Sequence, residues 1–341
     1  MSALGITHPT LLDVARRLDP DGKIAVIAET LSHYSEILDD ISFVEGNLPT
    51  GHKVTIRATL PTPSWRLLNK GVTQTKSSTN QITETCGIME AYSEIDKDVA
   101  LLNGNTKEFR WSEDIAHIEA MNQAFVTALV YGDTSVNPEQ FVGLAPRYYS
   151  LATTVTTCGN IINGGGEGSD NTSMWLVGWS PNTVTGIYPK GSMAGLQVND
   201  LGEQTVYDSD NKPFQAYRTH FQWKCGIAVK DWRFIVRIAN IDISDLETSG
   251  DTTDASANLL KMMSQALDKL PPNGSVRPVF YCNNRVRAML RVKMDSKSNV
   301  YITLKDIQSP IAGINRPTLH YQGVPVKRID EITVAEDLIT T

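Results

Sequence analysis

The chain has 341 residues, of which 41% are hydrophobic and 20% are charged, and its net charge is −7. This composition is typical of a globular protein that buries a sizeable core. No stretch approaches the roughly 20 apolar residues that cross a bilayer, and the first nine residues lack the features of a secretion signal. Because Lys and Arg are dispersed, tight sequence-specific binding of nucleic acid is not expected.

The first 44 residues are predicted to be helical, with one break. Thr10 is a suitable N-cap for a short helix over residues 11–18, and Pro20 interrupts this run. Apolar residues at spacings of three and four then predict a second, amphipathic helix over residues 24–38.

Residues 45–92 have a different character, with spaced prolines and a dense run of Ser and Thr. Residues 53–59 alternate, so Val54 and Ile56 point to one face while Lys53 and Arg57 point to the other. A returning strand is predicted over residues 81–88. A two-stranded arm of this kind is marginally stable alone, which indicates that a neighbouring subunit supports it.

Trp65 and Arg66 follow two prolines in the presumed tip of this arm. An exposed Trp beside an Arg has the composition of an interface anchor. A packing contact within the chain explains the same pair equally well, so both interpretations stay open at this point.

Residues 106–131 give the strongest helical pattern in the sequence. Asn105 and Glu108 have the spacing of a capping box, and Gly132 is expected to end the helix. At 1.5 Å per residue this helix is about 39 Å long. Its apolar face is predicted to carry Ile115, Ile118, Asn122, Phe125 and Leu129, with Met121 and Ala128 beside them.

Beyond residue 164 the pattern becomes mixed α/β. The apolar run 174–179 predicts a buried central strand, and two more strands are expected between residues 214 and 243. In the second of these, Trp232, Phe234, Val236 and Ile238 are predicted to share one face. Further strands are expected at residues 279–282, 300–304 and 324–329. The last of these is expected at a sheet edge because of Pro325. Helices are expected at residues 254–270 and about 284–294.

The sequence offers no catalytic constellation, and no cofactor or metal site is predicted. A Gly-rich loop at residues 164–168 lacks the frame of a phosphate-binding loop. His117 with Glu119 supplies only half of a zinc-deaminase signature, and both are predicted to lie on the polar side of the long helix. Asp242 and Asp245 fit helix ends and turns better than an acid–base or metal site.

Two further groups of residues have structural interpretations. The four cysteines are far apart and form no C-x-x-C pair, so reduced and mostly buried thiols are expected. The largest basic group has helical spacing and is interpreted as a solvated helix face. It comprises Arg285, Arg287, Arg291 and Lys293.

Several short motifs occur in a fixed order along the chain. A Gly-Asp at residues 132–133 and a Gly-Leu at residues 143–144 follow the long helix. A strand leads into an Asn-capped helix at residues 279–285, and a Gly-x-Pro-Val strand closes the chain at residues 323–326. In this order the motifs resemble the tailed-phage major capsid proteins of the Hong Kong 97-type fold. Four sequence segments resemble one subgroup of that family in particular: residues 44–52, 65–69, 118–123 and 231–233.

The resemblance covers nearly the whole chain and implies an α+β capsid fold. This fold has an N-terminal arm, an extended β-hairpin loop, a long spine helix, and peripheral and axial domains. The resemblance assigns residues 1–44 to the helical arm and residues 45–92 to the extension loop. Residues 93–150 would form the peripheral domain, with its spine helix at 106–132. Residues 151–317 would form the axial domain, with peripheral-domain strands at its edges, and residues 318–341 would return to the peripheral domain.

The resemblance further implies a non-enzymatic protein of the virion. Such a subunit self-assembles, through hexamers and pentamers, into an icosahedral shell around the double-stranded DNA of a tailed bacteriophage, in the cytoplasm of the bacterial host. Only 44 residues precede the extension loop, so a separate scaffolding protein is expected. A portal is also expected as a partner, and a decoration protein is a possible one. The packaged DNA would be contacted non-specifically, and no membrane is involved. The residues expected at subunit contacts are Lys53, Arg57, Trp65 and Arg66.

Two other classes of protein stay open on the sequence alone. An encapsulin has the same fold but encloses enzymes instead of a genome, and neighbouring genes would distinguish the two. An α+β enzyme of unknown reaction, metal-assisted around Asp242 and Asp245, would need a polar pocket with perturbed carboxylates.

Overall fold

The structure is a computed structural model, which describes residue 9 and residues 35–102, 106–208, 210–248, 254–272, 274–295, 302–308 and 315–340. Helices and strands are mixed along these residues, which is the α+β arrangement expected from the sequence. The predicted helix at residues 11–18 and the predicted cap at residue 105 lie outside the described residues. Of the helix predicted over residues 24–38, the structure describes the last turn, a 3-10 helix.

The helical elements agree well with the sequence pattern. α3 and α5 lie where long helices were predicted, and the N-terminus of α6 is capped by Asn283, whose Oδ1 accepts a hydrogen bond from the backbone N–H of Arg285 at 3.0 Å. The bounds are η1 (Glu36–Asp39), α2 (Lys97–Ala100), α3 (Thr106–Tyr131), η3 (Ala145–Arg147), η4 (Thr156–Asn160), η5 (Trp232–Phe234), α4 (Ile243–Thr248), α5 (Asp254–Lys269) and α6 (Asn284–Asp295).

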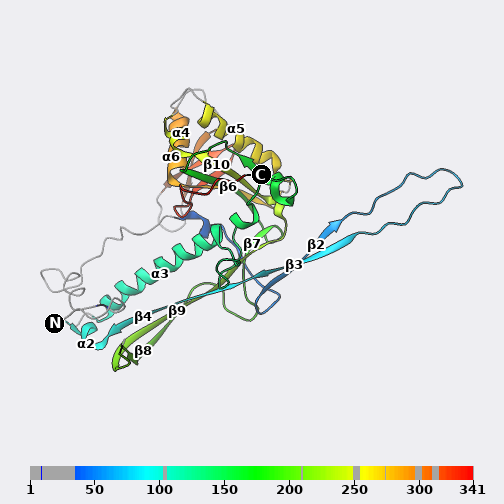
Figure 1. Cartoon of the computed structure of the whole chain (residues 1–341). Helices are drawn as coiled ribbons and strands as arrows, with labels where there is room; N and C mark the ends of the chain where they lie inside the picture. Colours follow the sequence, from blue (N-terminus) through cyan, green and yellow to red (C-terminus); the bar gives the residue numbers. More distant parts are fainter. Residues whose placement is uncertain are drawn as a thin grey trace.

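One large mixed sheet forms the body, and a separate two-stranded sheet projects from it (Figure 1). The strands of the large sheet are β1 (Phe43–Glu45), β4 (Gly87–Asp96), β5 (Ile161–Asn163), β6 (Asn171–Trp179), β7 (Val184–Tyr188), β8 (Gln197–Tyr207), β9 (Pro213–Val229), β10 (Ile235–Asp242), β11 (Arg277–Cys282), β12 (Ile302–Gln308), β13 (Asn315–Tyr321) and β14 (Val324–Arg328). The main path runs β12, β13, β14, β11, β6, β7, β9, β4, and β1, β5, β8 and β10 pair beside it. The projecting sheet pairs β2 (Gly51–Thr59) with β3 (Ser78–Thr85).

The central strands of the body are buried on both faces. Every residue of β6 is buried, as the apolar run predicted. The predicted shared face holds for Val236 and Ile238, which pack in the same cluster, but it is wrong for Trp232 and Phe234, because residues 232–234 form η5. Both faces of β10 are buried from its first residue through Ile241. Ile235 packs into one hydrophobic cluster and Val236 into another, so β10 separates two layers of core.

β14 does not lie at a sheet edge, although Pro325 predicted one. The strand pairs with β13 on one side and with β11 on the other. Pairing with β11 starts at Val326, so Pro325 precedes the residues that pair with β11. Its missing backbone N–H therefore costs that pairing no hydrogen bond. A proline near the start of a strand is therefore compatible with an interior position.

The long helix α3 runs beside β4, β9 and β8 as they extend away from the rest of the sheet (Figure 1). Its C-terminal half carries most of its buried residues, including Met121, Phe125 and Leu129. Ile115 and Ile118 are half-buried, so the predicted apolar face is correct but only partly covered in the single chain. The helix ends as predicted at Gly132, whose N–H donates to the carbonyl of Ala128 at 2.8 Å.

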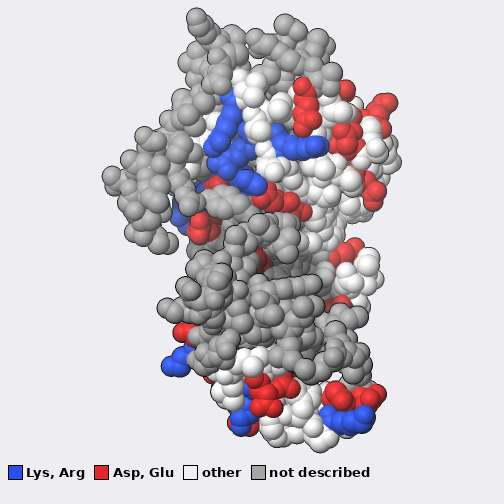
Figure 2. Space-filling model, turned by 90° about the vertical axis from the view of Figure 1, so that its left-hand side faces the viewer, with Lys and Arg blue, Asp and Glu red and all other residues white. Residues whose placement is uncertain are grey.

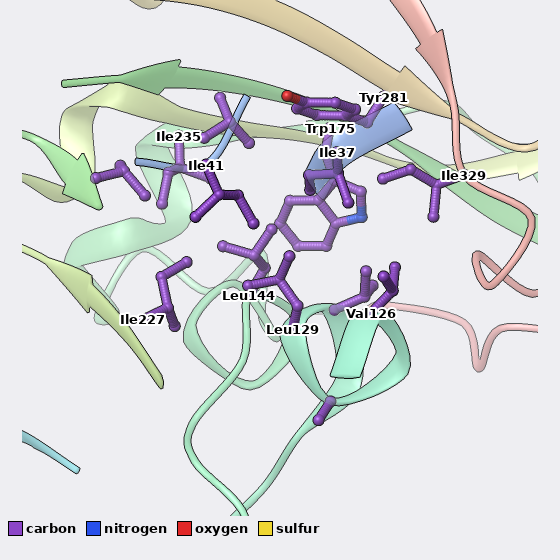
Figure 3. Close-up of a cluster of buried hydrophobic side chains, with 14 of the residues drawn as sticks. Ile37, Ile41, Val126, Leu129, Leu144, Trp175, Ile227, Ile235, Tyr281 and Ile329 are labelled. Carbon is purple, nitrogen blue, oxygen red and sulfur yellow. The ribbon is translucent and has the colours of Figure 1, made fainter. Parts of the chain in front are cut away.

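The main core joins the end of α3 to the sheet (Figure 3). Trp175 of β6 lies among Ile37 of η1, Val126 and Leu129 of α3, and Ile329 after β14. These residues come from four separate parts of the sequence. Their burial therefore fixes the long helix relative to the sheet.

Candidate assembly surfaces

The feature of the molecule that stands out is the projecting hairpin, here called the arm (residues 51–85). β2 and β3 pair in antiparallel register from Gly51 opposite Thr85 to Thr59 opposite Ser78, with one irregularity near Arg57. The returning strand was predicted at residues 81–88, but β3 ends at Thr85, and the chain continues into β4, which pairs with β9 in the body. The arm therefore consists of two strands and an exposed loop at residues 60–77 (Figure 1).

The two faces of the arm follow the predicted alternation. Val54 and Ile56 are half-buried, whereas Lys53 and Arg57 are exposed on the opposite face. Among the residues that the structure describes, neither cation has a carboxylate within salt-bridge distance. Both side chains are thus available to a carboxylate on another molecule.

The loop of the arm exposes large apolar side chains. Trp65 has its full surface in solvent, at 104% of the reference value, and Leu68 is 89% exposed. Trp65 therefore makes no packing contact with the described part of its own chain, and the second sequence interpretation of this residue is wrong. Arg66 is likewise exposed beside it. Exposed apolar groups that cluster in this way mark an interaction surface.

The arm and the remaining residues have opposite charge. Residues 51–83 contain no Asp or Glu and carry a net charge of +5. Since the whole chain carries −7, the other residues together carry −12. Charge complementarity of this kind favours contact between the arm of one copy and the body of another. The five cations are Lys53, Arg57, Arg66, Lys70 and Lys76.

The base of the arm is held to the body by a buried ion pair. The Arg147 guanidinium donates two hydrogen bonds to the Glu84 carboxylate, at 2.7 and 2.6 Å, and two more to the carbonyls of Val142 and Gly143. The Glu84 side chain is only 6% exposed. At Gly51, which is opposite Thr85, a Cβ would lie 2.0 Å from the Glu84 carbonyl oxygen, so only glycine fits there. These contacts set the direction in which the arm leaves the body.

Replacing Glu84 with Gln is expected to loosen this base. The change leaves the Arg147 charge buried without its counter-ion, which should lower the free energy of unfolding by about 3 kcal/mol. Thermal unfolding and hydrogen exchange across residues 78–85 would measure the loss. Asp210→Asn is the matched control, because the Asp210–Lys212 pair is exposed and should contribute almost nothing. Equal behaviour of the two variants would contradict a structural role for the pair.

The basic group on α6 is only partly the solvated face that its spacing predicted. Arg287 pairs with Glu36 at 2.9 Å, and both side chains are 11% exposed. Arg285 lies 3.6 Å from Glu247, and Arg291 is exposed. Figure 2 shows Lys and Arg gathered on the upper part of one face, at the end of the molecule that carries α4 and α6.

The residues considered for catalysis have structural partners. Asp242 accepts hydrogen bonds from the Ser244 hydroxyl and the Asp245 backbone N–H, at 2.9 and 3.0 Å, at the start of α4. His117 stacks on Phe221 with ring centroids 5.7 Å apart, so its predicted place on the polar side of α3 is wrong. Within the described residues, no group of three or more His, Cys, Asp or Glu side chains is arranged to hold a metal ion. No helix in the same residues is long and apolar enough to cross a membrane.

Burial of the cysteine side chains lowers the reactivity of their thiols. Cys225 and Cys282 are buried and Cys86 and Cys158 half-buried, and all four are free. Burial raises the pKa of Cys86 to about 11 and that of Cys282 to about 12. Thiolates are therefore scarce at neutral pH, which agrees with the predicted role as small hydrophobic residues.

A large mixed sheet, a long helix beside it and a projecting basic arm define a capsid subunit of the Hong Kong 97 type. The comparisons with known proteins give the family. A family model for the major capsid protein GP7 matches residues 19–340, and the chain belongs to this family. Curated protein sequences give no significant match.

Three solved structures illustrate what the chain is similar to. The bacteriophage Epsilon15 structure is 30% identical, covers 100% of both chains and has a TM-score of 0.80. The capsid of bacteriophage JBD30 is 10% identical over 89% of this chain and 92% of that chain, with a TM-score of 0.47. The SrpI encapsulin complex of Synechococcus elongatus PCC 7942 is 10% identical over 63% of this chain and 92% of that chain, with a TM-score of 0.39. The GP7 and Epsilon15 matches make this chain a tailed-phage major capsid protein.

Proposed function

We propose that copies of this chain form hexamers and pentamers and that the arm of each copy lies across its neighbour. The arm carries this proposal, because it is basic, exposes apolar side chains and, beyond its base at Glu84 and Arg147, projects away from the described part of its own chain (Figure 1). Each contact can be weak, since many symmetric contacts per subunit stabilise a closed shell. Lys53 and Arg57 would pair with carboxylates of the neighbour, while Trp65 and Arg66 would contact it from the loop.

Each part of the chain receives a role in this proposal. Residues 1–44 would be the N-terminal arm, and residues 45–92 would contain the extension loop. Residues 93–150 form the peripheral domain around α3. Residues 151–317 contain the axial domain, which meets its copies at five-fold and six-fold positions, and residues 318–341 return to the peripheral domain.

The remaining partners are proposed from the family. A separate scaffolding protein and a portal would act during assembly in the bacterial cytoplasm, and a decoration protein is a further candidate partner. The packaged double-stranded DNA would meet the inner surface without sequence specificity. A net charge of −7 supports weak contact, because an acidic surface does not hold a polyanion.

Negative-stain electron microscopy of the purified protein tests the proposal. The protein would be expressed alone and together with its neighbouring genes, and examined at several salt concentrations. We expect closed shells of uniform diameter, with nuclease-protected DNA inside particles made during infection. Monomers and small oligomers in every preparation would contradict self-assembly, and an enclosed enzyme in place of DNA would contradict the genome-enclosing role.

A further inference from the structure

An apolar pocket lies where the arm joins the body. It has a volume of about 180 Å³ and opens to solvent. Its walls come from the start of β4, from one face of α3 and from the segment that follows α3. The lining residues that matter here are Ile88, Met89, Ala124, Phe141 and Glu139 at the rim. An open apolar pocket of this size on a folded subunit indicates a missing hydrophobic side chain.

The pocket has the size and character of an aromatic binding site. A cavity of about 150 Å³ lined by aliphatic and aromatic side chains accepts benzene, so about 180 Å³ admits a larger ring. Met89 adds a thioether, which makes favourable contacts with aromatic rings. A tryptophan side chain therefore suits this pocket in both size and chemistry.

Trp65 is the exposed aromatic residue best placed to reach such a pocket. Trp65 lies fourteen positions after Gly51, which is at the base of the arm, and in extended conformation this stretch spans about 46 Å. The long helix α3 (26 residues) is about 39 Å long by comparison. The arm is thus longer than α3, and its loop projects well beyond the body, toward the space that a neighbouring copy would occupy (Figure 1).

Charge favours the same placement. The rim of the pocket carries Glu139, which is exposed. The loop that contains Trp65 carries Arg66 and Lys70 and no acidic residue. A contact between a basic loop on one copy and a pocket with an acidic rim on the next joins two different surfaces, head to tail. Repeated contacts of this kind give a closed assembly when the copies form a ring.

We propose that Trp65 of one copy inserts into the apolar pocket between β4 and α3 of the neighbouring copy and anchors the arm there. This inference rests on the proposed function, because it requires the arm to lie across a neighbour. It adds a defined ligand and a defined receptor site to that contact. Buried Trp side chains that fill a pocket are typical of residues that dominate the binding energy of an interface.

Two single substitutions test the anchor from its two sides. Trp65→Ala removes the side chain, and Ala124→Leu fills the pocket from an exposed position of α3 at little cost to the helix. Leu60→Ala is the control for the arm, since Leu60 is an exposed apolar residue of the same loop. Ala120→Leu is the control for α3, since Ala120 is also exposed, one turn earlier, and does not line the pocket.

The measurement is the subunit concentration needed for half-maximal shell formation, by light scattering and electron microscopy. We expect Trp65→Ala and Ala124→Leu each to raise it by roughly tenfold or more, and each control to change it far less. The double variant should lose little more than either single variant, because both remove one contact. Circular dichroism should show folded subunits throughout.

The outcomes separate this inference from the proposed function. Failure of the wild-type protein to form shells, both alone and together with its neighbouring genes, would overturn both. Wild-type shells that Trp65→Ala and Ala124→Leu affect no more than their controls would overturn the anchor alone. Additive losses in the double variant would also overturn it, because they would show that the two residues act in separate contacts.

Discussion

Removal of the loop of the arm is expected to abolish closed shells while the subunit stays folded. Thr59 and Ser78 are opposite each other at the end of the hairpin, and their hydroxyls lie 2.7 Å apart. Residues 60–77 can therefore be replaced by Asn-Gly, which closes a two-residue hairpin turn. The deleted residues are exposed, so their loss costs the fold little. Their apolar and basic side chains have no role in the described part of the single chain and should be needed only between copies.

The shortened variant should behave as folded monomers or small oligomers in sedimentation, with no shells by electron microscopy. A second variant keeps the loop length but replaces Trp65, Leu67 and Leu68 with Ser. It should also fail to close shells, because it retains the basic charge but loses the exposed apolar surface. Normal shells from the shortened variant would contradict any assembly role for the arm. Normal shells from the serine variant alone would assign that role to the charges.

Local sequence patterns predicted those parts of the arm whose structure depends only on residues close together in the chain. The alternation over residues 53–59 gave β2 and the faces of Lys53 and Arg57 correctly, because side chains of a strand alternate wherever it lies. The start of β3 was missed, because residues 73–85 are polar apart from Ile82, and only pairing with β2 sets their register. The division between β3 and β4 depends on β9, which is remote in sequence.

Contacts between distant residues were not predictable in the same way. Glu84 and Arg147 are 63 residues apart, and no spacing rule joins them. One signal was present: Glu84 is the first acidic residue after an acid-free stretch of more than thirty residues. The position of β14 likewise depended on which strands flank it, whereas Pro325 indicated only where a hydrogen bond is missing. Sequence reasoning found the arm, and the structure was needed to find what fixes its base.

The second large effect is expected at a buried ion pair that holds the C-terminal segment. Arg237 of β10 donates to the Glu336 carboxylate at 2.8 Å, and their side chains are 6% and 5% exposed. Ser173 also donates to this carboxylate, and the Tyr131 hydroxyl, at the end of α3, donates to it at 2.5 Å. Burial raises the pKa of the Tyr131 phenol, so it remains a donor at any working pH. Glu336 therefore joins the C-terminal segment to both the sheet and the long helix.

Glu336→Ala is expected to lower the melting temperature by roughly 5–10 °C, because a buried charge left without its partner costs about 3–5 kcal/mol. Differential scanning calorimetry would measure the change. Asp337→Asn, at the next residue, is the control, since Asp337 is exposed and should tolerate the change. An equal melting temperature for both variants would contradict the role of Glu336.

A double substitution separates the cost of an unpaired charge from the contribution of the pair. Arg237→Met with Glu336→Leu removes both charges and keeps apolar volume in the site. It should be less damaging than Glu336→Ala, because no uncompensated charge remains buried. A double variant as unstable as Glu336→Ala would show instead that the hydrogen bonds of Ser173 and Tyr131 carry the stability. In that case the carboxylate would act chiefly as the acceptor that holds α3 against the sheet.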